Sequence, residues 1–334
     1  MMYRRLGQSG LQISPLCLGA MMFGGAAAED DVDRIFASAR DHAVNFVDTA
    51  DAYNAGASEE VVGKALKVDR DQWVLATKIA NPIGPSVNQG GLSRKWLMEG
   101  TENSLRRLQT DYIDIQYLHK QDLATPLEET VRALGDLMQS GKIRYFGVSN
   151  YRAWRIAEIV RVCDQLGVAR PVVNQPCYNA MNRQPEVEDI PASRYYGLGV
   201  VPYSPLARGV LTGKYAPSSE PDASTRAGRG DPRMLQTEWR EESLVIAQKL
   251  KVHAESRGIT AGQFAMGWVL HNRAIASAIA GPRTLAQWTE YVGALEYDFM
   301  PEDEALVDEL VVTGHASTPG FNDPAYPIEG REVT

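Results

Sequence analysis

The chain has 334 residues, enough for one barrel-sized domain or for two smaller ones. Hydrophobic residues make up 44% and charged residues 23%, which is the balance of an ordinary globular protein with a full core. The formal net charge of −8 argues against general binding to nucleic acids or anionic membranes, although it leaves room for a local basic pocket.

The N-terminal segment carries neither the apolar stretch nor the cleavage site of a secretory signal. No uninterrupted apolar run approaches the ~20 residues that are needed to span a bilayer. Cys17, Cys163 and Cys177 are odd in number and include no C-x-x-C pair, so neither a disulfide framework nor a zinc site is indicated. We therefore expect a cytoplasmic protein with buried, reduced thiols and no bound metal.

The first predicted element is a small β-hairpin in 1–15, with its turn between Gly7 and Gly10. After it, β-type runs alternate with helical patterns. The predicted strands are 16–20, 45–50, 73–78, 112–119, 145–149, 172–175, 199–203 and 277–280. Eight repeats of strand and helix favour an α/β fold of the closed (β/α)8 TIM-barrel type, formed by 1–334 as a single domain. The alternative, an open doubly wound sheet, normally has G-x-G-x-x-G after its first strand, where this chain has GAMMFGG.

Two of the intervening helices carry start signals. The segment TPLE (125–128) predicts a capping box with proline at the first helical position, and Gly141 is expected to end that helix. Thr260 and Gln263 predict a second capping box. Two segments interrupt the alternation: 214–234, rich in Pro, Ser, Gly and Arg, and the proline-broken tail 314–334. Long loops on a compact domain tend to be functional, so both are candidates for binding loops.

Polar side chains stand where several predicted strands end. The runs in question are NFVDTADAY (45–53), WVLATK (73–78) and YIDIQYLH (112–119). They place Asp48, Lys78 and His119 at strand ends, with Tyr53 about one turn after the first of these strands. In a parallel α/β barrel the carboxyl ends of the strands open onto the active-site face, so this pattern predicts an enzyme.

The chemistry of these four residues suits proton transfer at an oxygen atom. An isolated tyrosine titrates near ~10 and donates a proton poorly at neutral pH, but a neighbouring ammonium favours the phenolate and lowers that pKa. Lys78, paired with Asp48, would act on Tyr53 in this way, and His119 would orient a substrate oxygen. Taken singly, each of these residues is more often structural. Together on one face of one barrel, they favour catalysis.

Other barrel chemistries fit less well. A metal hydrolase needs more histidine or aspartate ligands than one strand-end histidine. A Schiff-base aldolase could use Lys78, but an acidic partner works against keeping that lysine neutral. A proton donor at an oxygen is most natural where a hydride arrives at a carbonyl carbon, and this reaction requires a nicotinamide cofactor.

Two later loops predict a phosphate site. Barrels frequently bind phosphate with the loops after their seventh and eighth strands. Here these loops read SPLARGVLTGKY (204–215) and AGPRTLAQWTEY (280–291). Arg283 at a helix start would suit a terminal phosphate such as the 2′-phosphate of NADPH. The alternative, that Arg283 is a solvated surface charge, is the weaker one because both loops fall on the expected catalytic face.

With these residues in view, the chain resembles the aldo-keto reductase superfamily along essentially its whole length. The resemblance rests on DTADAYNAGASEEVVGKAL (48–66), TDYIDIQYLH (110–119), GKIRYFGVSN (141–150), YSPLARGVLTGKY (203–215) and IAGPRTLAQWTEY (279–291). The G-V-S-N form at 147–150 is similar to the branch that includes many bacterial reductases and the potassium-channel β subunits.

The resemblance implies a role for each matched residue. Tyr53 would be the general acid, tuned by Lys78 and Asp48, while His119 would orient the carbonyl. Ser149, Asn150 and Gln175 would bind the nicotinamide carboxamide, and Tyr203 would stack on its ring. The remaining implied cofactor contacts, around the pyrophosphate and the adenosine phosphate, are Ser204, Leu206, Gly209, Leu211, Lys214, Arg226, Gly281, Arg283, Gln287 and Glu290.

One position departs from the family pattern. Tyr291 stands where the family usually has an asparagine that contacts the adenine. Arg283 still favours NADP (NADPH) over NAD. The substrate would meet Met22 and Phe23, if these are not core residues, together with Tyr53 and His119. The resemblance also implies that 214–234 lies on the cofactor side and that 314–334 lies near the substrate pocket.

The predicted function is therefore an NAD(P)H-dependent oxidoreductase that reduces aldehydes or ketones to alcohols, or catalyses the reverse reaction. Its partner is a small carbonyl or alcohol, not a nucleic acid or a membrane. The alternative is an NADPH-sensing interaction module of the channel β-subunit type, with little turnover. The sequence specifies neither the substrate nor the oligomeric state.

Overall fold

The protein is described by a computed structural model that covers residues 2–218, 220–223 and 225–328. The chain divides into two compact units. The first unit comprises Met1–Pro176, Glu188–Tyr203 and Arg273–Thr289, and the second comprises Cys177–Val187, Ser204–Asn272 and Glu290–Thr334. That 1–334 forms a single domain stays a prediction.

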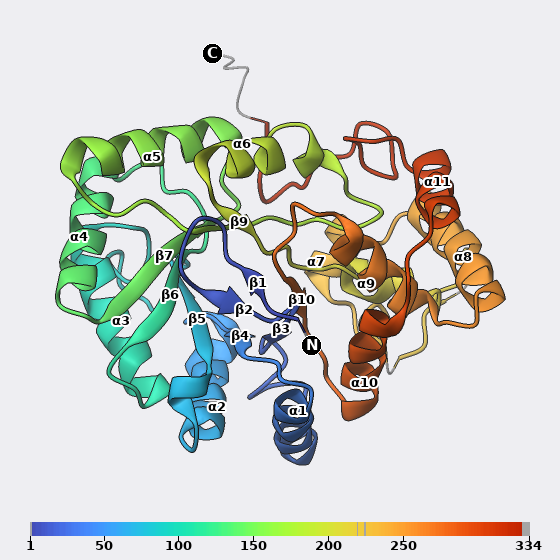
Figure 1. Ribbon diagram of the computed structural model, residues 1–334, viewed down its shortest axis with the longest axis horizontal. Coiled ribbons are helices and arrows are strands. Elements are labelled where there is room, and N and C mark those ends of the chain that lie inside the picture. The colour runs from blue at the N-terminus through green and yellow to red at the C-terminus, as the bar shows by residue number, and fades with distance from the viewer. Residues whose placement is uncertain (1, 219, 224, 329–334) are drawn as a thin grey trace. The chain divides into compact units, whose positions relative to one another are not determined.

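The first unit contains a closed barrel of parallel strands (Figure 1). Within the described residues the strands are β3 (Leu16–Gly19), β4 (Phe46–Asp48), β5 (Val74–Ile79), β6 (Ile113–Leu118), β7 (Ile143–Ser149), β8 (Val173–Gln175), β9 (Gly199–Val200) and β10 (Ala278–Ala280). Their order is β10-β3-β4-β5-β6-β7-β8-β9. The sheet closes between β9 and β10, because Ala276 N donates to Val200 O at 2.8 Å and Ile279 N donates to Pro202 O at 3.0 Å. Each strand falls on a predicted run, which confirms the (β/α)8 barrel.

The predicted N-terminal hairpin is confirmed as β1 (Arg4–Arg5) paired antiparallel with β2 (Gln12–Ile13). Its turn approaches the chain around β9 so closely that only glycine fits at position 7. A Cβ on Gly7 would lie 2.4 Å from Gly197 O, and the residue has φ +56°. Leu6, in the same turn, has no exposed surface. The hairpin therefore packs its apolar side chain into the barrel interior.

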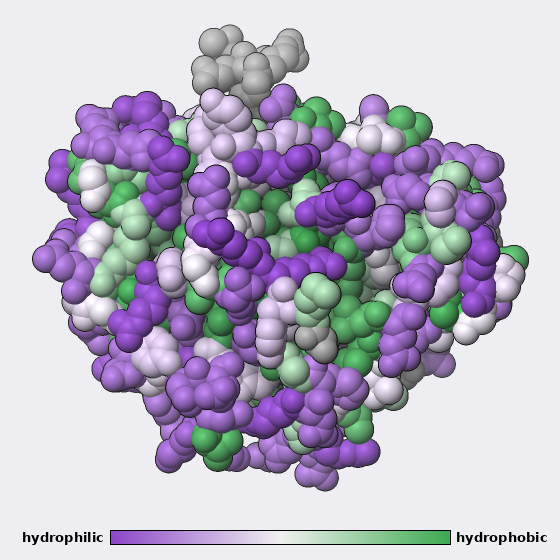
Figure 2. Space-filling view, viewed as in Figure 1, coloured by the Kyte–Doolittle hydropathy of each residue, from purple (hydrophilic) through white to green (hydrophobic). Residues whose placement is uncertain are grey.

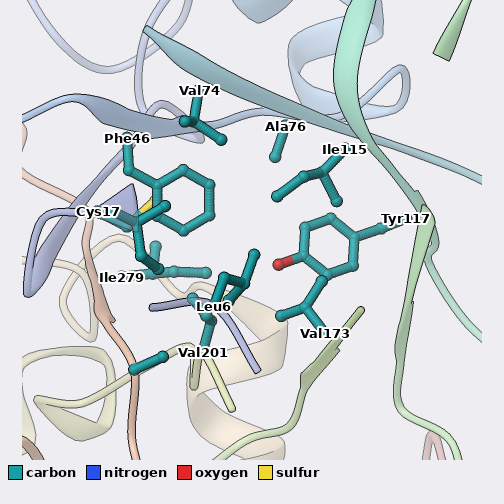
Figure 3. Close-up of a cluster of buried hydrophobic side chains, with 12 residues drawn as sticks. Leu6, Cys17, Phe46, Val74, Ala76, Ile115, Tyr117, Val173, Val201 and Ile279 are labelled. Carbon is teal, nitrogen blue, oxygen red and sulfur yellow. The ribbon is translucent and has the colours of Figure 1, made fainter. Parts of the chain in front are cut away.

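Buried side chains from most strands fill the interior of the barrel and point toward one another (Figure 3). The labelled members are Leu6, Cys17, Phe46, Val74, Ala76, Ile115, Tyr117, Val173, Val201 and Ile279. Side chains two residues apart lie on the same face of a strand. The next inward position after Phe46 is therefore Asp48, the next after Ala76 is Lys78, and the next after Tyr117 is His119. Strand periodicity alone thus places the polar residues on top of the apolar core.

Helices connect the strands of the first unit and lie outside them, as α3, α4 and α5 do beside β5–β7 (Figure 1). The helices are α1 (Glu29–Asp41), α2 (Ala57–Leu66), α3 (Arg94–Leu108), α4 (Leu127–Gln139), α5 (Ala153–Leu166) and α6 (Asp189–Tyr196). In α4 the buried positions include Leu127, Val131, Leu134 and Leu137. This spacing of three and four residues gives one apolar stripe for packing on the barrel.

One of the two predicted capping boxes is wrong. Thr125 Oγ1 donates to Asp122 Oδ2 at 2.7 Å, so it caps no helix, and Pro126 is the N-cap residue rather than the first helical residue. Asp122 also accepts from the backbone N–H groups of Ala124 and Thr125, and this local turn competes with the cap. The helix does end before Gly141, which has φ +73°.

The second unit contains most of the remaining helices. They are α7 (Pro232–Thr237), α8 (Glu241–Ser256), α9 (Ala261–His271) and α11 (Pro301–Leu310), while α10 (Leu285–Gly293) begins in the first unit. The predicted capping box of Thr260 and Gln263 is confirmed at the start of α9. The predicted loop 214–234 ends earlier than expected, because Asp231 caps α7 by accepting from Met234 N at 2.8 Å.

In the C-terminal tail, 314–328 contains no helix and no strand, and 329–334 lies outside the described residues. Among the helices of the described chain, none combines the length and the apolar character that a membrane span requires. Figure 2 shows that hydrophilic residues cover much of the visible face, with hydrophobic residues in smaller groups between them.

Candidate active site

The predicted catalytic residues come together at the carboxyl ends of adjacent strands in the first unit. Asp48 is the last residue of β4, Lys78 is the next to last of β5, and His119 directly follows β6. Tyr53 opens a short 3-10 helix, η1 (Tyr53–Gly56). Its backbone N–H donates to Ala50 O at 3.2 Å, so a tight turn returns the chain to the strand ends.

The turn after Tyr53 has an unusual backbone that neighbouring segments hold in place. Asn54 and Ala55 both have left-handed conformations, with φ of 49° and 55°. Non-glycine residues adopt such angles at an energetic cost, and they persist where the surroundings fix them. Here the Asn54 side chain donates to Met21 O at 3.0 Å and to Phe23 O at 2.8 Å. The loop after β3 therefore fixes the turn that carries Tyr53.

Lys78 and Asp48 form a buried ion pair. The Lys78 side chain has no exposed surface, and its Nζ donates to Asp48 Oδ1 and, at 2.8 Å, to Thr49 O. Gln175 Nε2 donates to the second carboxylate oxygen of Asp48 at 2.9 Å. Burial by itself would lower the pKa of Lys78, but attraction to Asp48 and Tyr53 and hydrogen bonds to both outweigh it and raise that pKa. The lysine is therefore an ammonium at neutral pH.

Tyr53 lies between this ammonium and His119. The Lys78 Nζ is 4.8 Å from the centre of the Tyr53 ring, and the lysine and the tyrosine are hydrogen-bonded. The Tyr53 and His119 rings meet edge to face, with centroids 5.8 Å apart and planes at 83°. Tyr53 is half-buried. The structure therefore brings the four predicted catalytic residues into one cluster.

His119 is held neutral and in one tautomer. Burial, followed by repulsion from Lys78 and Lys120, lowers its pKa to about 3. Asn81 Nδ2 donates to His119 Nδ1 at 3.0 Å, which places the ring proton on Nε2. Nothing in the sequence marked Asn81 as the partner of His119.

The residues expected at the nicotinamide are linked to this cluster by hydrogen bonds. Asn150 Nδ2 donates to His119 O at 2.9 Å and to Ser149 Oγ at 3.1 Å. Tyr203 OH donates to Asn150 Oδ1 at 2.8 Å, and Ser149 Oγ donates to Gln175 O at 2.8 Å. Asn150 has φ 57°, a left-handed conformation that asparagine tolerates better than most residues. The network fixes the orientation of these side chains next to the catalytic cluster.

In the second unit, the loop expected at the pyrophosphate contains several residues with a left-handed backbone. Left-handed φ angles occur at Ser204 (57°), Ala207 (47°), Arg208 (52°), Gly209 (98°) and Gly213 (66°). The backbone N–H groups of Ala207, Gly209 and Gly213 donate to the carbonyl oxygens of Ser204, Leu206 and Val210, so these turns are closed by hydrogen bonds within the loop. The loop includes the short 3-10 helix η4 (Ala207–Thr212).

The other residues expected around the pyrophosphate differ in the exposure and the pairing of their side chains. The side chains of Leu206 and Leu211 are buried. Only the backbone atoms of these two residues could therefore contact a cofactor. Lys214 is exposed, and a Cβ on Gly209 would lie 3.2 Å from its Nζ. Arg226 donates to Asp231 Oδ2 at 2.8 Å, so its guanidinium is already paired with a carboxylate.

The residues of the expected adenosine-phosphate motif are divided between the two units. In the first unit, Gly281 is exposed, and Arg283 N donates to Gln287 Oε1 at 2.7 Å, which fixes the start of α10. In the second unit, Glu290 accepts from Thr260 Oγ1 at 2.5 Å, next to the capping box of α9. Tyr291 is buried.

The two candidate substrate residues after β3 have different environments. Met22 is half-exposed, whereas Phe23 has no exposed surface and packs against Phe36 at a centroid distance of 5.8 Å. This placement favours the core alternative for Phe23. Over the described residues, no group of three or more His, Cys, Asp or Glu side chains is arranged to hold a metal ion.

The chain is similar to known proteins over most of its length. The model of the aldo/keto reductase family matches residues 15–312. A probable voltage-gated potassium channel subunit beta of Arabidopsis thaliana is 38% identical over 301 residues, which cover 89% of this chain and 92% of that protein. A putative subunit of the same name from Schizosaccharomyces pombe is 34% identical over 321 residues, covering 92% and 93%. An uncharacterized oxidoreductase, YrpG, of Bacillus subtilis is 34% identical over 331 residues, covering 96% and 98%.

Proposed function

Because the chain belongs to the aldo/keto reductase family, we propose that it is an NAD(P)H-dependent oxidoreductase that reduces aldehydes or ketones to alcohols, or catalyses the reverse reaction. One observation carries this proposal. A fully buried ammonium, Lys78, contacts both Asp48 and Tyr53, and a histidine that cannot be protonated at neutral pH lies beside them. This arrangement serves the transfer of a proton to an oxygen atom.

Tyr53 is the proton donor in this proposal. When its hydroxyl gives a proton to the substrate oxygen, a negative tyrosinate remains. The Lys78 ammonium attracts and stabilises that charge, and the attraction is strengthened because the lysine is withdrawn from water. Asp48 holds the ammonium in place through its own hydrogen bond, and Gln175 holds Asp48. The cluster thus makes a weak acid into an effective one.

His119 has a separate task. Because its ring is neutral and its proton lies on Nε2, it donates a hydrogen bond to the substrate oxygen without giving up its proton. Such a donor polarises a carbonyl and orients it toward Tyr53. The site combines a tyrosine with a histidine of lowered pKa because Tyr53 gives up a proton, whereas His119 only donates a hydrogen bond.

The nicotinamide cofactor, when bound, supplies the hydride. The residues beside the cluster fit its nicotinamide end, where Ser149, Asn150 and Tyr203 would face the ring. The resemblance to the family assigns the pyrophosphate to the loop 204–213. Arg283 would take the 2′-phosphate, so we propose NADPH as the preferred cofactor and NADH as the weaker one. A small carbonyl compound would bind next to Tyr53 and His119.

A second candidate function is a cofactor-sensing interaction module with little turnover. It is favoured by the names of the relatives from Arabidopsis thaliana and Schizosaccharomyces pombe, which are channel β subunits. The presence of all four catalytic side chains in contact favours the enzyme.

The two functions are separated by measuring NADPH consumption with a panel of aliphatic aldehydes, aromatic aldehydes, sugars and ketones, with NADH in parallel. The proposed enzyme should reduce at least one class with kcat of about 1 s⁻¹ or more, within the usual range of metabolic enzymes. Tight NADPH binding with turnover slower than about 0.01 s⁻¹ on every class would instead support the sensing module.

A further inference from the structure

A buried carboxyl group that the proposed mechanism does not use lies directly behind the catalytic cluster. Asp51 stands between β4 and Tyr53 and is only 1% exposed. Among the described residues, neither oxygen of its carboxyl group accepts a well-formed hydrogen bond. Its backbone N–H donates to the carbonyl oxygen of Lys78 at 3.1 Å, so the residue is tied to the strand that carries the catalytic lysine.

A second buried carboxyl, that of Glu59 on α2, faces the same region but is fully engaged. It accepts from Thr77 Oγ1 at 2.5 Å and from Arg107 Nε at 2.6 Å, and its side chain has no exposed surface. Arg107 thereby forms its ion pair with Glu59. Glu59 is therefore the member of the two acids that is paired with a cation, whereas within the described chain Asp51 has no hydrogen-bonded cation.

The electrostatic surroundings of Asp51 favour its neutral form. Burial and then repulsion from Glu59 raise its pKa to about 8, while Arg107, the backbone N–H of Ala52 and Lys78 oppose the rise. A carboxyl group in such a position binds a proton at neutral pH instead of remaining as an unpaired buried charge. Asp51 is therefore a protonated acid attached by its backbone to the strand of Lys78.

We propose that Asp51 is a positioning residue, held as a neutral carboxylic acid behind Lys78, whose loss of a proton slows carbonyl reduction at alkaline pH. This inference rests on the proposed function, because it acts through the Lys78–Tyr53 contact. The only bond that breaks is the O–H bond of Asp51, and its proton passes to solvent.

The effect follows from the charges that face one another in this cluster. With Asp51 neutral, Glu59 and Arg107 cancel, and Asp48 and Lys78 cancel, so the surroundings of Tyr53 carry little net charge. An ionised Asp51 adds one uncompensated negative charge. That charge opposes the tyrosinate that forms when Tyr53 gives up its proton, so reduction slows as the pH rises through about 8.

The protonation of Asp51 can be tested without any turnover, through the pH dependence of stability. Because its pKa rises from about 4 unfolded to about 8 folded, the folded protein holds one more proton in this window, and this contribution to stability is lost as the pH rises. The asparagine of Asp51→Asn has no acidic proton to lose. The Tm of this variant should therefore fall less steeply than that of the wild type between these pH values. Asp51→Ser, which is also neutral, provides the same comparison if the first variant does not fold.

The effect on catalysis is tested by the pH profile of kcat for carbonyl reduction. The wild type should lose activity with an inflection near pH 8, and this inflection should be absent from the neutral variant. Asp189→Asn is the matched control. Asp189 also has a raised pKa, of about 6, but burial raises it against the opposing charge of Arg152, and Lys78 is not among its causes. The control should keep the wild-type inflection.

The outcomes are distinct. A flattened Tm profile together with a lost inflection supports the proposal. A Tm profile unchanged in both neutral variants overturns it, because Asp51 would then not hold the proton. A flattened Tm profile with the inflection retained also overturns it, because the proton would not act on Tyr53. Failure of the proposed function would appear separately, as absence of turnover in the wild type, while the Tm comparison would still report on Asp51.

Discussion

Replacing Lys78 by methionine removes the ammonium while leaving an apolar side chain of similar length in the barrel interior. In the wild type, Lys78 donates to Asp48 Oδ1 and to Thr49 O, and both lysine and aspartate are almost completely buried. After the substitution, Gln175 remains as a neutral donor to the Asp48 carboxylate. The perturbation therefore leaves a buried charge without its counter-charge.

The expected loss of stability follows from these contacts. Each hydrogen bond from a charged donor contributes about 1.5–3 kcal/mol, so the two bonds of Lys78 together correspond to roughly 3–6 kcal/mol. Removing one partner of a buried ion pair costs about 3–5 kcal/mol in other proteins. Both lines of reasoning place the loss for Lys78→Met at about 4 kcal/mol, which would lower the urea midpoint by roughly 1 M or more.

The assay is urea unfolding at neutral pH, followed by tryptophan fluorescence. The double variant Asp48→Asn/Lys78→Met removes the orphaned carboxylate and should recover most of the loss. Lys64→Met is a control for the loss of a lysine as such, because the pair of Lys64 with Glu29 is exposed, and it should leave the midpoint unchanged. A loss below about 1 kcal/mol in the single variant, or a double variant as unstable as the single one, would refute the reasoning.

Three further predictions concern other parts of the structure. The His119 ring should not titrate between about pH 5 and 8 in nitrogen NMR spectra, because burial and Lys78 lower its pKa to about 3; an inflection near 6.5 would contradict this. Arg283→Ala should raise the Kd for NADPH by roughly tenfold or more, as expected for a charge-assisted contact to phosphate, and should leave the Kd for NADH nearly unchanged in fluorescence titrations. Thr260→Ala should destabilise the protein by about 0.5–2 kcal/mol in the same urea assay, since it removes the cap of α9; an unchanged midpoint would mean that the cap contributes nothing.

The barrel and the candidate catalytic cluster were accessible from the sequence because both depend on local pattern. Apolar runs marked the strands, and alternation along each strand placed Asp48, Lys78 and His119 on the inward face above the core. Thr260 formed its expected cap because its hydroxyl accepts from Gln263 N while it donates to a distant carboxylate. Thr125 did not form its expected cap. Asp122, three residues earlier, accepts hydrogen bonds from the Thr125 hydroxyl and from the Thr125 backbone N–H, and this holds the segment in a turn.

Other features depend on contacts between segments that are far apart in the sequence. Asn81 reaches the ring of His119 across 38 residues, and Glu59 meets Arg107 across 48 residues. The residue types can be read from the sequence, but these pairings arise only when the helices and loops pack around the barrel. Asp51 shows the same limit, since a surface aspartate and a buried neutral one look alike in sequence.

The central claim is that Tyr53 gives the proton to the substrate oxygen, and single-turnover reduction of an aromatic aldehyde such as 4-nitrobenzaldehyde by Tyr53→Phe tests it most directly. Phenylalanine keeps the ring beside Lys78 and His119 but removes the hydroxyl. The account predicts a rate at least roughly 100-fold below that of the wild type, the usual contribution of a general acid, with a Kd for NADPH that changes little. A folded Tyr53→Phe variant that binds NADPH normally and reduces the aldehyde at the wild-type rate would contradict the account.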